Sequence, residues 1–326
     1  MNIIEVKNLY KNYGKVEAVK GISFDVLQGE IFGFLGPNGA GKTTTINILC
    51  TLLKQSSGET FLDGLDISKN RNDVRKRIGL VFQDTTLDDY LTAEENIKFH
   101  AYAYGIPRTI RTNRIETLLK MVGLWDRRKE SVRNYSGGMR RRLEIARGLL
   151  HLPKVLFLDE PTLGLDPQTR RTIWEHINEI RQKDKITIFM TTHYMDEAEQ
   201  CNRIAIIDHG KIIALDTPKQ LKVALGGDTI QITTDNVTEA IKELKSLNLI
   251  PKINANNITF TVPNGNEFLP KFVHEFKQKI ISIGLRTPTL DDVFISLTGK
   301  AIREENRSST EQMRTWRQRR GMRGPR

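Results

Sequence analysis

The sequence predicts an α/β protein with a largely parallel sheet, and three observations support that fold class. Short apolar strands alternate with helical stretches over the first half of the chain, which is typical of parallel sheets covered by helices. A glycine-rich loop stands between the first buried strand and the helix that follows it. Beyond residue 226 a second, shorter alternation begins, which predicts a small α+β domain after the main one.

The first domain is expected to span residues 1–225. "IIEVKNLYK" and "GISFDV" alternate apolar and polar residues, as half-exposed antiparallel strands do, so they predict an antiparallel β subdomain. "TAEENIKFHAYAYG" and "RIETLLKMVGL" are helical in pattern, and no strand pattern accompanies them, so we expect a helical subdomain inserted at about 84–147. The predicted buried strands are 31–35, 78–82, 155–158, 186–190 and 203–207.

Residues 226–300 are expected to form the small domain. Their predicted element order is β-α-β-β-α-β, and "LDDVFISLTG" is expected to close the domain as a short helix. The remaining residues, 301–326, are polar and arginine-rich, so disorder is the default expectation there. Nine Lys and Arg but three Asp and Glu lie between Lys300 and Arg326, so much of the net charge of +11 belongs to this tail.

Composition favours a cytoplasmic protein. No apolar run approaches the roughly 18 residues of a membrane span, and the N-terminus lacks the pattern of a signal peptide. The cysteines, Cys50 and Cys201, are two and far apart, so they imply no disulfide framework and fit a reducing compartment. If the protein works at a membrane, we expect another chain to cross it.

The glycine-rich loop reads Gly36-x-x-x-x-Gly41-Lys42-Thr43 and lies between an apolar strand and an apolar-periodic helix. Glycines let successive backbone N–H groups turn toward one anion, and the helix N-terminus adds a positive end. Lys42 is predicted to reach the β- and γ-phosphates of a nucleotide, and the Thr43 hydroxyl to coordinate Mg²⁺. A chance glycine turn is the alternative, but the flanking strand and helix argue against it.

"VLFLDEPT" places Asp159 and Glu160 at the end of a buried strand. An acidic pair at this position is more often a solvated strand end. The phosphate loop upstream favours a functional role for the pair instead. Asp159 is then expected to hold Mg²⁺ through water, and Glu160 to orient and polarise the attacking water.

Three further residues carry weak signals on their own. His193 and Gln83 each end an apolar strand. Because parallel strands end at one sheet edge, both are expected to lie near Asp159, which strengthens the prediction that they are functional. As neutral donors they could contact the γ-phosphate or the attacking water. Tyr13 precedes the loop on a strand edge and is either a surface tyrosine or a platform for adenine stacking.

"YSGGMRRR" resembles a second anion site. Ser136 is a good helix N-cap, and Gly137 and Gly138 permit close approach of a backbone or ligand. Arg140, Arg141 and Arg142 then fall in the first turn, where the helix dipole disfavours cations. The simpler interpretation is a capped helix with solvated arginines.

In their order and spacing, "GPNGAGKTT", "VFQ", "YSGGM", "VLFLDEPTLGLDP" and "TTHYMDEAE" resemble the nucleotide-binding subunit of ABC transporters, over roughly residues 2–220. The resemblance implies a P-loop NTPase fold, ATP and Mg²⁺. It makes Glu160, His193 and Gln83 catalytic and assigns Thr43, Gln83 and Asp159 to the metal. The nucleotide contacts that it implies are Tyr13, Gly36, Pro37, Asn38, Gly39, Ala40, Gly41, Lys42, Thr43, Thr44, Ser136, Gly137, Gly138 and Asp166.

The resemblance also implies the partners. Ser136 to Gly138 would bind the γ-phosphate held by the other subunit, so complete sites need a head-to-tail homodimer, and the helical subdomain would engage a separate integral-membrane permease. Met139 in place of the usual glutamine, with the C-terminal "TPTLDDVFISLTGK", resembles the daunorubicin-resistance type of exporter ATPase. Ser136 and Gly138 remain, so inactivity is not implied.

We therefore expect an exporter ATPase that is peripheral on the inner face of the cell membrane. A soluble ABC-type ATPase acting on ribosomes or nucleic acid is the alternative, but the chain has one cassette and no heptad run. The basic tail could contact anionic lipid, and a solvated extension is the commoner outcome. It lacks aromatic interleaving, so nucleic acid is not an expected partner. The transported substrate contacts the permease and is not encoded here.

Overall fold

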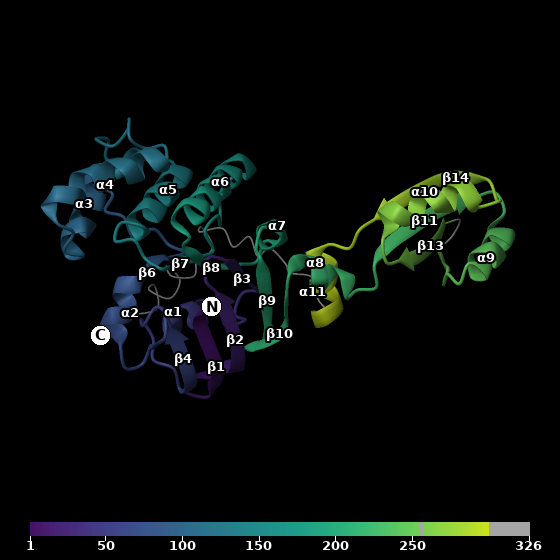
Figure 1. Ribbon diagram of the computed structural model, residues 1–326, viewed down its shortest axis with the longest axis horizontal. Coiled ribbons are helices and arrows are strands. Elements are labelled where there is room, and N and C mark those ends of the chain that lie inside the picture. The colour runs from purple at the N-terminus through teal and green to yellow at the C-terminus, as the bar shows by residue number, and fades with distance from the viewer. Residues whose placement is uncertain (255–256, 300–326) are drawn as a thin grey trace, which may run out of the picture.

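The computed structural model describes residues 1–254 and 257–299, so the predicted tail at 301–326 lies outside the described residues. Three sheets organise the described chain. Figure 1 shows the first two packed together and the third set apart, beyond α8 and α11. The predicted α/β class, with its antiparallel and helical subdomains and its small α+β domain, is confirmed.

The central sheet has the strand order β10-β9-β3-β8-β7-β6, and every neighbouring pair is parallel except β9 with β10. All five predicted buried strands are present, with ends that differ by a residue or two, and β10 adds an antiparallel edge. The strands are β3 (Ile31–Leu35), β6 (Ile78–Val81), β7 (Val155–Asp159), β8 (Thr187–Thr192), β9 (Arg203–Asp208) and β10 (Lys211–Asp216).

The N-terminal sheet is antiparallel, in the order β2-β1-β4-β5. The two predicted half-exposed strands pair with each other, and a short hairpin follows the phosphate-loop helix. The strands are β1 (Asn2–Tyr13), β2 (Val16–Leu27), β4 (Ser57–Leu62) and β5 (Leu65–Asp66).

Alternation along the buried strands divides the first domain between two cores, because successive strand residues point to opposite faces. Phe32 and Phe34 of β3 pack toward the antiparallel sheet, together with α1 (Lys42–Leu49) and α2 (Arg71–Arg77). Ile31 and Leu35 of the same strand pack toward the other helices. Both faces of the strand are therefore covered.

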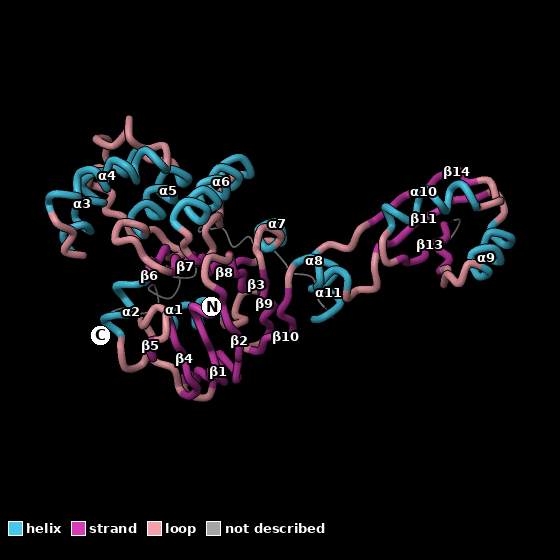
Figure 2. The backbone as a smooth tube through the Cα atoms, viewed as in Figure 1, coloured by secondary structure: helices cyan, strands magenta, loops and turns pink. Residues whose placement is uncertain are grey.

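The remaining helices of the first domain lie on the side of the central sheet toward which Ile31 and Leu35 point. The first of them form the inserted subdomain, and the structure confirms that it is helical. A single isolated β-bridge, between Thr92 and Ser131, is the only β pairing among residues 84–147. Figure 2 shows α3, α4 and α5 grouped at one end of the molecule beside α6. The helices are α3 (Ala93–Ala103), α4 (Arg108–Met121), the 3₁₀ turn η1 (Val132–Asn134), α5 (Gly137–Gly148), α6 (Pro167–Asp184), α7 (Met195–Ala198) and α8 (Pro218–Val223).

The third sheet follows the predicted element order and is antiparallel, in the order β12-β13-β11-β14. It has a core of its own, in which Ile230, Phe260 and Phe272 are buried. The elements are β11 (Asp228–Thr234), α9 (Val237–Ser246), β12 (Lys252–Asn254), β13 (Asn257–Val262), α10 (Gly265–Glu275) and β14 (Ile280–Arg286).

The closing helix forms as predicted, but its predicted place is wrong. α11 (Leu290–Thr298) packs against α7 and α8, and its side chains Leu290, Val293 and Phe294 are buried in the core of the first domain. An amphipathic helix buries its apolar stripe against any complementary face, and spacing along the chain does not say which one. The chain therefore leaves the first domain, builds the small sheet and returns.

Candidate functional site

The phosphate loop lies between β3 and α1, and contacts with the surrounding backbone require two of its glycines. A Cβ at Gly36 would lie 2.2 Å from the carbonyl oxygen of Ile207, and one at Gly41 would lie 2.7 Å from that of Ala18. Gly41 also has φ 106°, and Gly39 has φ 80° with nothing within 4 Å of an added Cβ. The loop therefore packs closely against the surrounding backbone at Gly36 and Gly41 and is open at Gly39, an arrangement that suits the binding of an anion.

The helix after the loop is well placed to receive negative charge. α1 begins at Lys42 with no side-chain cap and no acidic residue in its first turn. Its first backbone N–H groups therefore point out of the helix without an internal acceptor, and the helix dipole adds positive potential there. These features fit a phosphate group.

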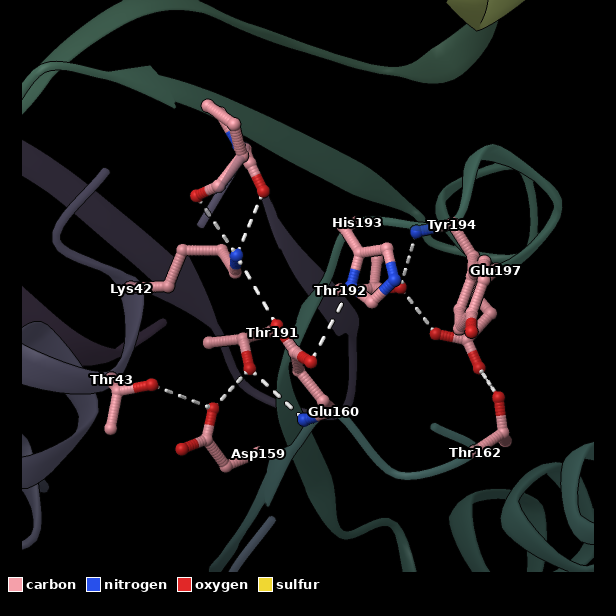
Figure 3. Close-up of polar contacts among 12 residues, drawn as sticks. Lys42, Thr43, Asp159, Glu160, Thr162, Thr191, Thr192, His193, Tyr194 and Glu197 are labelled. Carbon is pink, nitrogen blue, oxygen red and sulfur yellow. Dashed lines mark hydrogen bonds and ion pairs between the residues drawn. The ribbon is translucent and has the colours of Figure 1, made fainter. Parts of the chain in front are cut away.

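Lys42 links the loop to the end of β7. Its buried ammonium donates to the carbonyl oxygens of Gly36 (2.8 Å) and Pro37 (3.2 Å), and lies 3.3 Å from Glu160 Oε1 (Figure 3). Burial lowers the pKa of Lys42, and the charge of Glu160 opposes that shift. The pair keeps a cation next to the loop.

Glu160 stands between two partners at the strand end: Lys42 on one oxygen and His193 Nδ1 at 3.4 Å from Oε2 (Figure 3). Its backbone is left-handed, with φ 47°, and its N–H donates to the carbonyl of Thr191 at 3.2 Å. Burial raises the pKa of Glu160, but its interactions with the nearby His193 ring and with the charge of Lys42 outweigh burial, so its pKa is lowered. The carboxylate is therefore ionised at neutral pH.

Asp159 and Thr43 place a carboxylate and a hydroxyl side by side. Asp159 is buried, and its Oδ1 accepts from the hydroxyls of Thr43 (3.5 Å) and Thr191. Burial raises the pKa of Asp159, and the hydrogen bonds from Thr191 and Thr43 oppose that shift. Carboxylate and hydroxyl oxygens are the donors that Mg²⁺ prefers, so these residues fit the ion.

The other predicted residues lie outside the cluster of Lys42, Glu160 and His193. Gln83 follows β6, is exposed, and its side chain makes no hydrogen bond with the described residues. Tyr13 ends β1, is 49% exposed, and has the Lys11 ammonium 5.0 Å from its ring centroid.

Two further predicted residues cap helices. Asp166 caps α6 by accepting from Thr169 N at 2.9 Å. Ser136 is exposed and caps α5 by accepting from Met139 N at 3.3 Å. A Cβ at Gly138 would lie 2.3 Å from Thr169 Cγ2, so packing of α5 against α6 requires that glycine.

The simpler interpretation of α5, a capped helix with three solvated arginines, does not hold for Arg141. Its guanidinium is buried and donates to backbone carbonyls at the ends of β6 and β7. Arg140 pairs with Asp89, and Arg142 donates to Val122 O. Because α5 begins at Gly137, Arg141 and Arg142 lie just beyond its first turn and not within it as predicted, and carbonyl groups at the strand ends provide the negative potential around the Arg141 guanidinium.

Glu197 is a further buried acid near the site, and sequence patterns did not single it out. Glu197 of α7 accepts hydrogen bonds from the hydroxyls of Thr162 and Thr192, and so joins the segments that carry Glu160 and His193 (Figure 3). The sequence feature that could have pointed to Glu197 is the spacing of "TTHYMDE", which places an acidic residue one short turn after the strand end.

Comparisons with known proteins identify the family of the chain. The family model described as ABC transporter matches residues 19–163. The chain is 36% identical over 312 residues to the linearmycin resistance ATP-binding protein LnrL of Bacillus subtilis (strain 168), covering 93% of this chain and 100% of that protein. It is 35% identical over 318 residues to the daunorubicin resistance ATP-binding protein DrrA2 of Streptomyces coeruleorubidus, covering 94% and 98%.

Solved structures resemble the first domain. The chain matches cbiO1 from Clostridium perfringens, part of the ABC transporter complex cbiONQ, with a TM-score of 0.64 and 32% identity over 68% of this chain and 90% of that one. It matches the dimeric ATP-binding cassette MJ0796 bound to ADP and Pi with a TM-score of 0.60 and 29% identity, over 66% and 98%. The protein therefore belongs to the ABC transporter family, as an ATP-hydrolysing subunit of the daunorubicin-resistance exporter type.

Proposed function

We propose that this ATPase drives export through a separate membrane permease, and that Glu160 is its catalytic base. The observation that carries the assignment is the carboxylate of Glu160, held between Lys42 and His193 at the end of β7. In this arrangement the phosphate loop and Lys42 bind the β- and γ-phosphates of ATP. Glu160 then orients a water for attack on the γ-phosphorus and accepts its proton.

The remaining residues hold or sense the nucleotide. Thr43, Asp159 and Gln83 would hold Mg²⁺, which would neutralise charge on the phosphates when bound. His193 holds Glu160 through its ring nitrogen and would donate toward the γ-phosphate. Tyr13 would stack on adenine. Gly36–Thr44 supply the backbone of the cradle, and Asp166 lies at the start of α6, on the side where the second subunit would approach.

We infer that the complete site needs two copies of the chain. Ser136 is exposed at the start of α5 and contacts neither Lys42 nor Glu160 of its own chain. With Gly137 and Gly138 it would bind the γ-phosphate on the phosphate loop of the other copy. One of the solved structures that the chain matches is dimeric.

The permease, location and substrate class are inferred from the family. No helix among the described residues is long and apolar enough to cross a membrane. We propose that the helical subdomain engages a separate permease and that the protein is peripheral on the cytoplasmic face of the cell membrane. Drug resistance in the names of LnrL and DrrA2 supports efflux of a drug-like molecule. Contact of residues 301–326 with anionic lipid stays a prediction outside the described chain.

Substitution of Glu160 by Gln tests the proposal. Because the amide cannot accept the proton of the water, we expect kcat for ATP hydrolysis to fall at least about 100-fold, with ATP still bound. The variant should accumulate as an ATP-bound dimer in size-exclusion chromatography. Hydrolysis at the rate of the natural chain would contradict the role of Glu160. Lys42→Ala is the control, and it should weaken ATP binding itself.

A further inference from the structure

Arg141 uses every donor that an arginine has. Its Nε donates to Pro161 O at 2.6 Å, and its Nη2 donates to Asp159 O at 2.9 Å and Glu160 O at 3.1 Å. Its Nη1 donates to Phe82 O and, at 3.2 Å, to Glu144 Oε2. A guanidinium has five N–H groups, so each has an acceptor here.

These bonds fix the backbone on which Glu160 stands. Three consecutive carbonyls, from 159 to 161, turn toward the one guanidinium, and the N–H of Glu160 is held by Thr191. The left-handed φ of 47° at Glu160 is a conformation that non-glycine residues rarely adopt without support from their surroundings. Arg141 provides that support from another element, α5.

The same face of α5 also holds the loop that contains Gln83. Arg141, Glu144 and Arg147 lie three residues apart and therefore share one face of the helix, and all three are buried. Glu144 Oε1 accepts from Thr86 N at 2.8 Å, and Arg147 donates to Thr86 O at 2.9 Å. With the bond from Arg141 to Phe82 O, both ends of the segment 82–86 are tied to α5.

We propose that Arg141 is a positioning residue for ATP hydrolysis, which ties the turn carrying Glu160 and the loop carrying Gln83 to α5. The proposal rests on the proposed function, in which the start of the same helix, at Ser136, meets the nucleotide of the other subunit. A nucleotide bound there would set the position of α5, and Arg141 would pass that position to the catalytic carboxylate of its own chain. The two half-sites of one chain would thus be mechanically connected.

Arg141→Lys is the direct test, because lysine keeps the charge but has three donors and no planar fork. We expect kcat to fall at least about tenfold, since small displacements of a catalytic group reduce the rate strongly. The Kd of monomeric protein for a fluorescent ATP analogue should stay within about twofold, because the phosphate loop is untouched. Arg142→Lys is the matched control on the next residue, which donates to Val122 O, and it should keep the natural kcat.

A cycle with Glu160→Gln separates positioning from general damage. If Arg141 acts through Glu160, then Arg141→Lys should slow single-turnover hydrolysis in the natural background and have little further effect in the Glu160→Gln background. Rates are expressed per mole of protein that binds ATP, so partial unfolding cannot imitate the result. Equal slowing in both backgrounds would overturn the proposal, as would a natural rate for Arg141→Lys.

A second variant covers the case in which Arg141→Lys does not fold. Glu144→Gln keeps Arg141 and an acceptor for Thr86 but removes the charge that faces the guanidinium, and it should lower kcat with an unchanged Kd. A natural kcat in this variant would overturn the proposal. Failure of the proposed function would look different, because Glu160→Gln itself would then hydrolyse ATP at the natural rate.

Discussion

At the scale of single residues, buried polar groups that do not belong to the nucleotide site shape it. Glu197 accepts hydrogen bonds from the hydroxyls of Thr162 and Thr192, and the tilted ring of Tyr194 packs beside His193, with ring centroids 4.2 Å apart. The Arg170 guanidinium covers Tyr194 at 3.9 Å from its ring centroid. His193 is therefore held from the strand, from α6 and from α7 at once.

Substitution of Glu197 measures how much its hydrogen bonds contribute to the free energy of unfolding. Glu197→Ala leaves two buried hydroxyls without their acceptor and opens a cavity, so we expect a loss of about 3 kcal/mol in the free energy of unfolding. Glu197→Gln keeps an acceptor and should lie within about 1 kcal/mol of the natural chain at neutral pH. Urea denaturation followed by fluorescence measures both. A similar loss in the two variants would contradict this role for the hydrogen bonds.

The stability difference between the natural chain and Glu197→Gln should depend on pH. Burial raises the pKa of Glu197, and the hydrogen bonds from Thr162 and Thr192 oppose it. Because the folded-state pKa lies above the unfolded value, the contribution of Glu197 to stability is greatest at low pH and falls as the pH rises through the unfolded pKa toward the folded one. Gln does not titrate, so Glu197→Gln should gain stability relative to the natural chain as the pH rises above about 4, the ordinary pKa of a Glu side chain. A constant difference would contradict the shift.

At the scale of elements, α11 connects the two halves of the chain. It follows the small sheet in sequence, but its apolar face lies in the first core, and its start is fixed by a capping box of Thr289 and Asp292. Arg286, the last residue of β14, pairs with Asp292 at 2.7 Å. The small domain is thus joined to the first through α8 on one side and α11 on the other (Figure 1).

Truncation of Phe294 tests whether α11 stabilises the first domain. Phe294 is 2% exposed and lies in the first core, so Phe294→Ala should cost about 3–5 kcal/mol in the unfolding of that domain. Ile295, its neighbour, is 44% exposed, and Ile295→Ala is the matched control, with an expected loss below about 1 kcal/mol. Trp174 is buried in the same core, so its fluorescence can follow denaturation. Equal losses in the two variants would argue against the packing of α11.

At the scale of the whole molecule, the proposed head-to-tail pair predicts that two inactive variants regain activity when they are mixed. Lys42→Ala removes the phosphate-loop half of a site, and Ser136→Arg removes the other half without disturbing a buried residue, since Ser136 is exposed. Each variant alone should be inactive. In a random mixture half of the pairs are mixed, and each mixed pair has one intact site, so up to about a quarter of the natural rate should return.

Measurement of ATPase rate against mixing ratio checks this prediction. The recovered rate should be greatest near equal amounts of the two variants, because mixed pairs are then most abundant. No recovery at any ratio, with both variants folded by circular dichroism, would contradict the shared site.

Sequence reasoning was strongest where a local pattern determines the backbone. The glycines of the phosphate loop, the apolar strands before Lys42 and Asp159, and the N-cap at Ser136 are all local features, and propensity and spacing suffice to predict them. The meeting of Lys42, Glu160 and His193 was also within reach, because parallel strands end at one edge of their sheet.

The sequence by itself determined the α/β class, the order of its elements and the residues that line the phosphate loop. The tertiary structure alone decided which buried partner each remaining polar group meets. It placed Arg141 on the carbonyls of residues 159–161, Glu197 between two threonines, and α11 in the first core. These contacts join segments far apart along the chain. Helix and strand periodicities report which face of an element is apolar, and they carry no information on which distant face it will cover.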